Sequence, residues 1–107
     1  MFTFNSEVKE TDLGGGIRRK ILSYGDDMMA VEVKFEEGAV GATHSHPHIQ
    51  ISYVLEGEFV ATIGDETKTI SKGDTYYTLP GVPHGVVCTK AGALLDIFNP
   101  KREDFLK

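Results

Sequence analysis

Residues 38–57 read GAVGATHSHPHIQISYVLEG, and the fold and the function are both inferred outward from this stretch. His44 and His46 stand two positions apart in it, Gln50 follows, and a glycine lies at either end. Side chains at i and i+2 of an extended strand project from the same face, so both imidazoles can reach one metal ion. Histidines of a polar surface loop would give the same local pattern, so the pair alone leaves both interpretations open.

Further ligands for such an ion are available nearby. Gln50 begins the next expected strand, and His84 follows a Pro-Gly-Val-Pro turn whose two prolines stiffen its approach. Three imidazoles and an amide oxygen are donors that zinc, nickel, iron and manganese all accept. His44, His46, Gln50 and His84 are therefore the candidate ligands for one divalent ion, and their chemistry does not choose the metal.

The rest of the chain has the pattern of an antiparallel all-β protein. Short runs rich in Val, Ile, Tyr, Phe and Thr alternate with glycine-containing turns, and no segment sustains a helical period. The strands are expected at 17–23, 28–35, 49–55, 58–63, 67–70, 75–78, 84–88 and 93–98. Turns are expected between them, at 56–57 and 90–92 among other places, and many short strands favour a sandwich or closed barrel. A single helical turn should follow the last strand, with Asn99 as its cap and Pro100 at its first position.

Length and composition narrow the class of protein. The 107 residues suit one domain, 1–107, and 40% hydrophobic with 25% charged residues is ordinary for a globular chain. No apolar run is long enough to cross a bilayer, and the first residues lack the pattern of a secretory signal, so a cytoplasmic protein with no membrane partner is expected. The single cysteine, Cys88, excludes an internal disulfide and is expected to be a small buried hydrophobe.

Charge argues against a nucleic-acid partner. The formal net charge is -5, and no stripe of Lys and Arg with interleaved aromatic residues is present. The only basic cluster, residues 18–20, is most simply a solvated strand face, although one of its side chains could meet an anionic ligand.

An acid interrupts the last apolar strand. Asp96 lies within LLDIF at 94–98, where a buried carboxylate needs compensation that a cavity with a cation would supply. Strand parity places Asp96 and Phe98 on one face and Leu95 and Ile97 on the other. If the acid faces a cavity, the apolar pair needs separate cover, which another sheet or the second subunit of a homodimer could provide.

The spacing Gly38-x5-His44-x-His46-x3-Gln50-x6-Gly57, with Gly73-x6-Pro80-Gly81-x2-His84, resembles the two motifs of the cupin superfamily. The resemblance implies a small single-domain cupin β-barrel of the jelly-roll, or double-stranded β-helix, type that holds its metal inside on these four side chains. The sequence departs from the general pattern at Gln50, Leu79 and Cys88, where Glu, Pro and Asn are usual.

A narrower resemblance covers nearly the whole chain and is most specific in LDIFNPKREDFL at 95–106. This segment, with GIRRK at 16–20 and HGVV at 84–87, is similar to the pectin-degradation cupins of the KdgF family, in which glutamine also occupies the position of Gln50. The resemblance implies metal-dependent linearisation of 4,5-unsaturated uronates to 5-keto-4-deoxyuronate. It places Asp96, Phe98 and Arg102 in the active site, with Asp96 as the proton carrier and Arg102 and Phe98 on the substrate.

His48 and the reaction itself are less constrained. The stretch between His46 and Gln50 is one residue shorter than in that family, and Pro47 breaks the strand register, so His48 is interpreted as a rim residue that contacts substrate. Three histidines and one further ligand also suit a metal-dependent dioxygenase, and the fold permits a non-catalytic cupin that binds a sugar or an anion. These two alternatives stay open.

Overall fold

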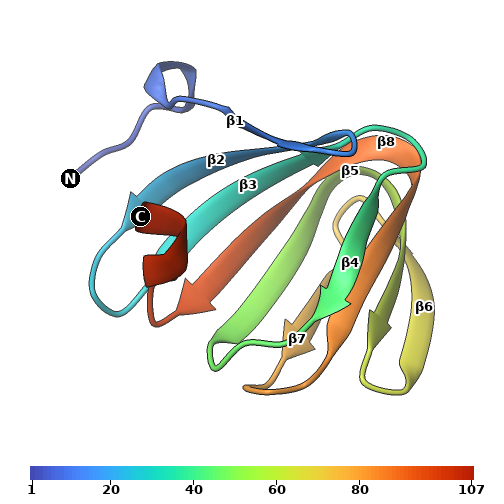
Figure 1. The fold of residues 1–107 in the computed structure, drawn as a ribbon. Helices are drawn as coiled ribbons and strands as arrows, with labels where there is room; N and C mark the ends of the chain where they lie inside the picture. Colours follow the sequence, from blue (N-terminus) through green and yellow to red (C-terminus); the bar gives the residue numbers. More distant parts are fainter.

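One antiparallel sheet of eight strands forms the body of the chain in the computed structural model, which describes residues 1–107. The main path of neighbours is β1-β2-β3-β8-β5-β6, with β4 beside β8 and β7 beside β5. Figure 1 shows the sheet curled over, with β2 and β3 on one side and β4 and β6 on the other. The predicted all-β barrel is confirmed. Its elements are η1 (Asn5–Glu7), β1 (Thr11–Gly14), β2 (Ile17–Tyr24), β3 (Met29–Phe35), β4 (Val40–His44), β5 (Ile49–Ile63), β6 (Glu66–Ser71), β7 (Thr75–Thr78), β8 (His84–Asn99) and η2 (Glu103–Leu106).

Two long strands, β5 and β8, run through both halves of the barrel. The first half of β8 lies between β4 and the second half of β5, and its second half lies between β3 and the first half of β5. The expected turns at 56–57 and 90–92 are therefore wrong, because each is a bend inside one continuous strand. The β5–β8 register shifts there, between Val54 and Phe59.

Glycine makes this bend possible. Gly57 has φ +82°, and a Cβ added to it would lie 2.5 Å from the Lys90 carbonyl oxygen. A Cβ on Gly92 would run into the Glu56 carbonyl oxygen. The two backbones thus approach each other closely at positions where neither strand has room for a side chain. Glycine is needed for this close approach, but in the sequence it is equally typical of a tight turn.

Two short strands and the helical turn also differ from expectation. No separate strand was expected at the positions of β1 and β4, which pair with β2 and β8 respectively. The helical turn after the last strand is confirmed as η2, but it begins at Glu103 and Asn99 does not cap it. Asn99 instead ends β8, and its side-chain Nδ2 donates to the Asp27 carbonyl oxygen at 2.8 Å.

The hydrophobic core fills the end of the barrel near the bends. Its main cluster contains Phe35, Ala39, Val54, Phe59, Ala61, Val86, Cys88 and Leu94, and Phe35 and Phe59 meet edge to face at 5.2 Å. Cys88 is fully buried in it, as expected, and burial raises the pKa of its thiol. A smaller cluster of Met29, Val31 and Phe98 lies toward the opposite end. No helix in the structure has the length and apolar character needed to cross a membrane.

Candidate metal centre and active site

Three histidines meet inside the barrel, although they come from three different segments. His44 ends β4, His84 begins β8, and the two are register partners across these strands. His46 lies in the loop after β4, so the expectation that it shares a strand face with His44 is wrong, and the loop returns its ring to the same place. One ligand atom from each of the three lies within 4.8 Å of the others, which is close enough for a shared ion.

Backbone carbonyls fix the orientation of these rings. The Nδ1 atoms of His44, His46 and His84 lie 2.9, 3.1 and 2.9 Å from the carbonyl oxygens of Ala42, His48 and Val82. An Nδ1–H that donates to a carbonyl leaves the Nε2 lone pair free, as in many metal-binding histidines. The buried Nε2 of His84 has no hydrogen-bond partner in the protein. An ion would satisfy that atom.

Gln50 is the fourth predicted metal ligand, and its contact with His46 gives a second test of whether these residues fit a metal ion. Its Oε1 lies 2.8 Å from His46 Nε2. Burial lowers the pKa of His46, so the ring is neutral and carries only one N–H. That proton cannot serve both Gln50 and the His48 carbonyl, and a cation shared by His46 Nε2 and Gln50 Oε1 removes the conflict. The four predicted residues therefore fit a divalent ion.

Asp96 faces the cavity beside this cluster. Its Oδ1 accepts a 2.6 Å hydrogen bond from Ser52, its register partner on β5. Desolvation raises the pKa of Asp96 to about 6, although the Ser52 hydrogen bond and the charges of His44 and Arg102 oppose the shift. A carboxyl group with a pKa near neutrality can both take up and release a proton.

A cavity of about 190 Å³ connects these groups with the C-terminal segment. His44, Gln50, His84 and Asp96 line one part of it, and Phe98, Arg102 and Phe105 line another. The guanidinium of Arg102 lies 5.1 Å from the centre of the Phe98 ring. The structure therefore brings the predicted active-site set, Asp96, Phe98 and Arg102, to the cavity that the predicted metal ligands border.

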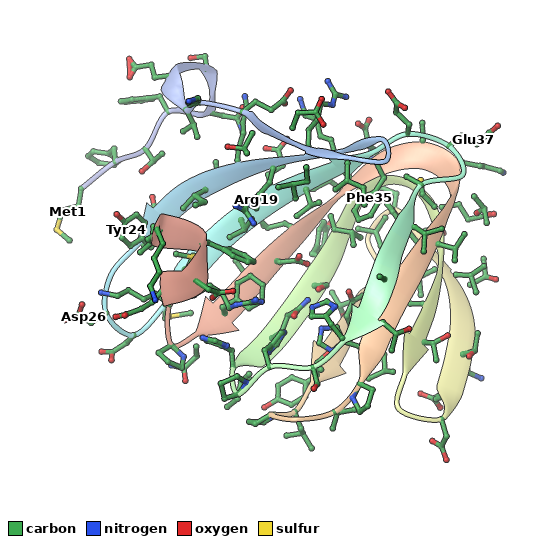
Figure 2. All side chains as sticks on the ribbon, viewed as in Figure 1. Met1, Arg19, Tyr24, Asp26, Phe35 and Glu37 are labelled. Carbon is green, nitrogen blue, oxygen red and sulfur yellow. The ribbon has the colours of Figure 1, made fainter.

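Arg102 forms an ion pair with Asp104, whereas Arg19, a second arginine that lines the cavity, has no ion-pair partner. Asp104 accepts two hydrogen bonds from Arg102, at 3.0 and 2.8 Å, and the arginine lowers the pKa of this carboxyl group. Arg19, half-buried on β2, stacks on Phe105 at 4.1 Å and lines the same cavity with no carboxylate within ion-pair distance. Figure 2 labels Arg19 between β2 and the C-terminal turn. The cavity therefore holds a guanidinium that has no ion-pair partner.

The sequence interpretation allowed one side chain of residues 18–20 to meet an anionic ligand without choosing Arg19, and it missed Ser52, although a signal existed for each. Ile17, Arg19 and Ile21 alternate along one face of β2, and both isoleucines pack against the core. Ser52 shares its strand face with Gln50 and Val54, which are buried. Parity thus predicts that both polar side chains point inward.

His48 lies outside the cavity. Its ring packs against Phe98 with centroids 6.3 Å apart, and it borders a separate polar crevice with Asp26, Lys101 and Asp104. Its backbone oxygen supports His46, as described above. A role of its side chain on the substrate stays a prediction.

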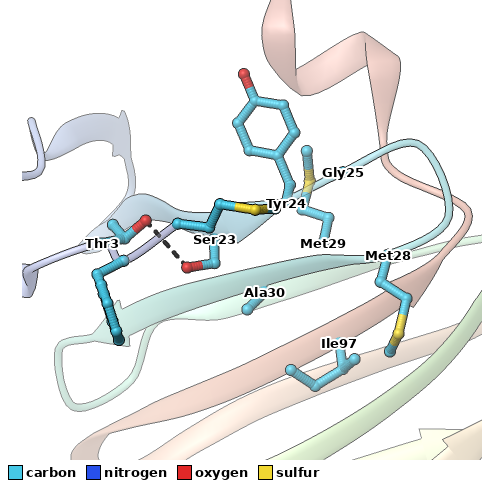
Figure 3. Close-up of a pocket in the computed structure, with 10 residues that line it drawn as sticks. Thr3, Ser23, Tyr24, Gly25, Met28, Met29, Ala30 and Ile97 are labelled. Carbon is cyan, nitrogen blue, oxygen red and sulfur yellow. Dashed lines mark hydrogen bonds between the residues drawn. The ribbon is translucent and has the colours of Figure 1, made fainter.

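The largest cavity of the molecule is elsewhere. It measures about 520 Å³ and lies between the N-terminal residues and the β2–β3 turn, with Met28, Met29 and Ile97 in its wall (Figure 3). Its lining is mostly apolar, and its one internal side-chain hydrogen bond joins Ser23 to Thr3 at 3.0 Å. It contains no metal-ligating cluster, so the smaller cavity inside the barrel is the candidate active site.

The comparison with known proteins agrees with this fold and site. The cupin domain family matches residues 31–98, a segment that includes all four predicted ligands, and the chain belongs to this family. Within it, the chain is 42% identical over 107 residues to the pectin degradation protein KdgF of Dickeya dadantii (strain 3937), covering 98% of this chain and 97% of that protein. It is therefore a cupin of the KdgF family, and the predicted resemblance is confirmed.

Two solved structures extend the similarity to three dimensions. KdgF from Halomonas sp. matches with a TM-score of 0.94 at 38% identity, covering 98% of this chain and 99% of that one. An RmlC-like cupin from Shewanella frigidimarina NCIMB 400 matches with a TM-score of 0.95 at 42% identity, covering 97% and 94%. The fold is thus shared with these proteins over nearly the whole chain.

Proposed function

We propose that this chain linearises 4,5-unsaturated uronates to 5-keto-4-deoxyuronate. The observation that carries the proposal is the composition of one cavity: a carboxyl group with a raised pKa stands beside three convergent histidines, and an unpaired arginine lies across from it. The similarity to proteins named for pectin degradation supports a uronate as the substrate class.

The reaction needs one bond broken and one proton moved. The anomeric hydroxyl loses its proton, the bond from the anomeric carbon to the ring oxygen breaks, and an aldehyde and an enolate result. The enolate becomes a ketone when carbon 4 gains the proton that the hydroxyl lost, so reactant and product are isomers. A divalent ion on His44, His46, Gln50 and His84 would supply Lewis-acid stabilisation of the negative oxygen that develops.

Residues of the chain would perform the proton transfer and the positioning. Asp96 would take the proton from the anomeric hydroxyl and return one to carbon 4, a role that suits its raised pKa. Arg19 and Arg102 would hold the substrate carboxylate, and Arg19 offers the unpaired guanidinium. Phe98 would form an apolar wall that orients the ring and limits water.

The test is direct. Metal-loaded protein is mixed with freshly prepared 4,5-unsaturated galacturonate, loss of the ultraviolet absorbance of the double bond is followed, and a chelated sample runs alongside. Accelerated, metal-dependent loss is expected. Oxygen consumption in place of linearisation would indicate a dioxygenase, and saturable binding without turnover would indicate a sugar- or anion-binding cupin. Either result would refute the proposed reaction.

We also propose that the protein is a homodimer that buries the outer face of β5 and β8. Ile51, Tyr53 and Tyr77 are 45%, 42% and 53% exposed there, and Ile51 pairs with Ile97 while Tyr53 pairs with Leu95. Side chains of these types gathered on one sheet face are typical of a contact surface, and a twofold dimer is the commonest assembly.

A further inference from the structure

Three polar side chains, those of Gln50, Ser52 and Asp96, form a hydrogen-bonded chain that begins at the histidine cluster. Gln50 Oε1 lies 2.8 Å from His46 Nε2, Gln50 Nε2 donates to Ser52 Oγ at 2.8 Å, and Ser52 Oγ donates to Asp96 Oδ1 at 2.6 Å. Gln50 and Ser52 are 4% and 0% exposed, so water has little access to replace these bonds. Ser52 is the middle member of this chain, and it takes no part in the proposed reaction.

The strands fix these contacts. Gln50 and Ser52 are two positions apart on β5 and point to the same face. Ser52 is the register partner of Asp96 on β8, so the hydroxyl and the carboxylate stand opposite each other. No loop movement is needed to form or to keep this arrangement.

We propose that Ser52 is a positioning residue that keeps the oxygen of the Gln50 amide, and not its nitrogen, turned toward the histidine cluster. A serine hydroxyl has one proton, and the Asp96 carboxylate accepts it. The Ser52 oxygen then presents only lone pairs to Gln50, so the amide can meet it only with its NH₂ group. The carbonyl oxygen must therefore point the other way.

This orientation opposes the one that the amide would prefer without a metal. His46 donates from Nδ1 to the His48 carbonyl, which leaves a lone pair on Nε2. An amide NH₂ turned toward that lone pair would form a good hydrogen bond, whereas the observed oxygen faces it without a proton between them. An amide nitrogen does not ligate a cation as its oxygen does. Ser52 thus preorganises a ligand that would otherwise have to rotate before it could bind.

The proposal rests on the metal site of the proposed function but not on its reaction, so the readout is metal affinity. Metal-stripped protein is titrated with Zn²⁺ in competition with a chromophoric chelator. Loss of an outer hydrogen-bond partner commonly weakens metal binding by about 10- to 100-fold, and Ser52→Ala should fall in that range. The matched control is Thr78→Val, because Thr78 is the register partner of Gln50 and its buried hydroxyl has no hydrogen-bond partner. Its affinity should equal that of the wild type.

Two further comparisons separate positioning from packing. Ser52→Thr and Ser52→Val have nearly the same shape and differ in the hydroxyl, so Thr should bind Zn²⁺ more tightly than Val even if both perturb the strand. In a Gln50→Glu background, the ligand has two equivalent oxygens and needs no orientation, so Ser52→Ala should cost much less there. The two substitutions would then be non-additive, which a purely structural role for Ser52 does not produce.

The outcomes are distinct. Equal Zn²⁺ affinities in wild type and Ser52→Ala, equal affinities in the Thr and Val variants, or additive losses in the double variant would each overturn the role of Ser52. A wild-type protein that binds no Zn²⁺ would overturn the role of Ser52 together with the zinc site, whereas a wild-type protein that binds Zn²⁺ but does not linearise uronates would refute the proposed reaction alone.

Discussion

Replacing Arg19 by methionine should weaken the enzyme selectively toward anionic substrates. Arg19 lines the cavity with its guanidinium stacked on Phe105 at 4.1 Å, and no carboxylate lies within ion-pair distance of it. Arg102, in contrast, already has two hydrogen bonds to Asp104. Methionine keeps most of the apolar contact with the ring and removes the charge, so the variant isolates the electrostatic contribution.

The expected size follows from one lost charge-assisted interaction. Hydrogen bonds to charged groups contribute about 1.5–3 kcal/mol, which corresponds to a loss of roughly 10- to 150-fold in kcat/KM. The loss should appear mainly in KM, because the carboxylate is held equally before and during ring opening. Arg102→Met should cost more than this contact alone, since it also leaves Asp104 without its partner.

The assay compares unsaturated galacturonate with its methyl ester, which has no charge to bind. Arg19→Met should lose activity on the acid and little on the ester, so that the preference for the acid collapses. The matched control is Arg18→Met, because Arg18 is the exposed neighbour on β2 and pairs with Glu10 at 3.4 Å. Equal losses on acid and ester, or an unchanged KM for the acid, would show that Arg19 does not bind the carboxylate.

Four more outcomes are expected. Asp96→Asn should abolish linearisation while Zn²⁺ still binds, and full activity would exclude Asp96 as the proton carrier. The pKa of Asp96 is raised from 3.8 to about 6 in the folded chain, so between these pH values the folded metal-free chain binds a proton that the unfolded chain does not. The free energy of unfolding should therefore fall as the pH rises from about 4 to about 6. Denaturant titrations at several pH values should show this fall in the wild type and not in Asp96→Asn. Gly92→Ala should destabilise the fold by about 3 kcal/mol, since its Cβ would strike the Glu56 carbonyl, whereas Gly25→Ala, with open space around it, should change the melting temperature little. Ile97→Glu should convert a dimer to a monomer in light scattering, and an unchanged mass would refute the proposed interface.

Features that depend on the local alternation and spacing of residues could be predicted from the sequence. Alternation along residues 94–98 correctly predicted which side chains of the last strand face inward, Asp96 and Phe98 among them. The four candidate ligands were predicted from their spacing together with the resemblance to the cupin motifs, and the structure brings the four side chains together. His46 reached the cluster by a different backbone path from the one expected, since β4 ends at His44.

Features that depend on which strands become neighbours were not predictable in the same way. The Ser52–Asp96 hydrogen bond joins residues 44 positions apart and exists because β5 and β8 pair in one particular register. Gly57 and Gly92 have the composition of tight turns, and only their mutual contact reveals two bent strands. The stacking of Arg19 on Phe105 likewise depends on how the tail folds back over the barrel.

The path of β8 through the barrel limits the insertions and deletions that this strand can accept. One continuous strand carries His84 at its first position and Asp96 and Phe98 near its last, so a single insertion or deletion between them would turn the acid or the histidine to the outer surface. Phe105 and Arg102, by contrast, belong to a segment after β8 that pairs with no strand. Replacement of residues 100–107 would therefore alter the side of the cavity that Arg102 and Phe105 line while His84 and Asp96 stay in place, and exchange of that segment between related barrels would test which ligands this side selects.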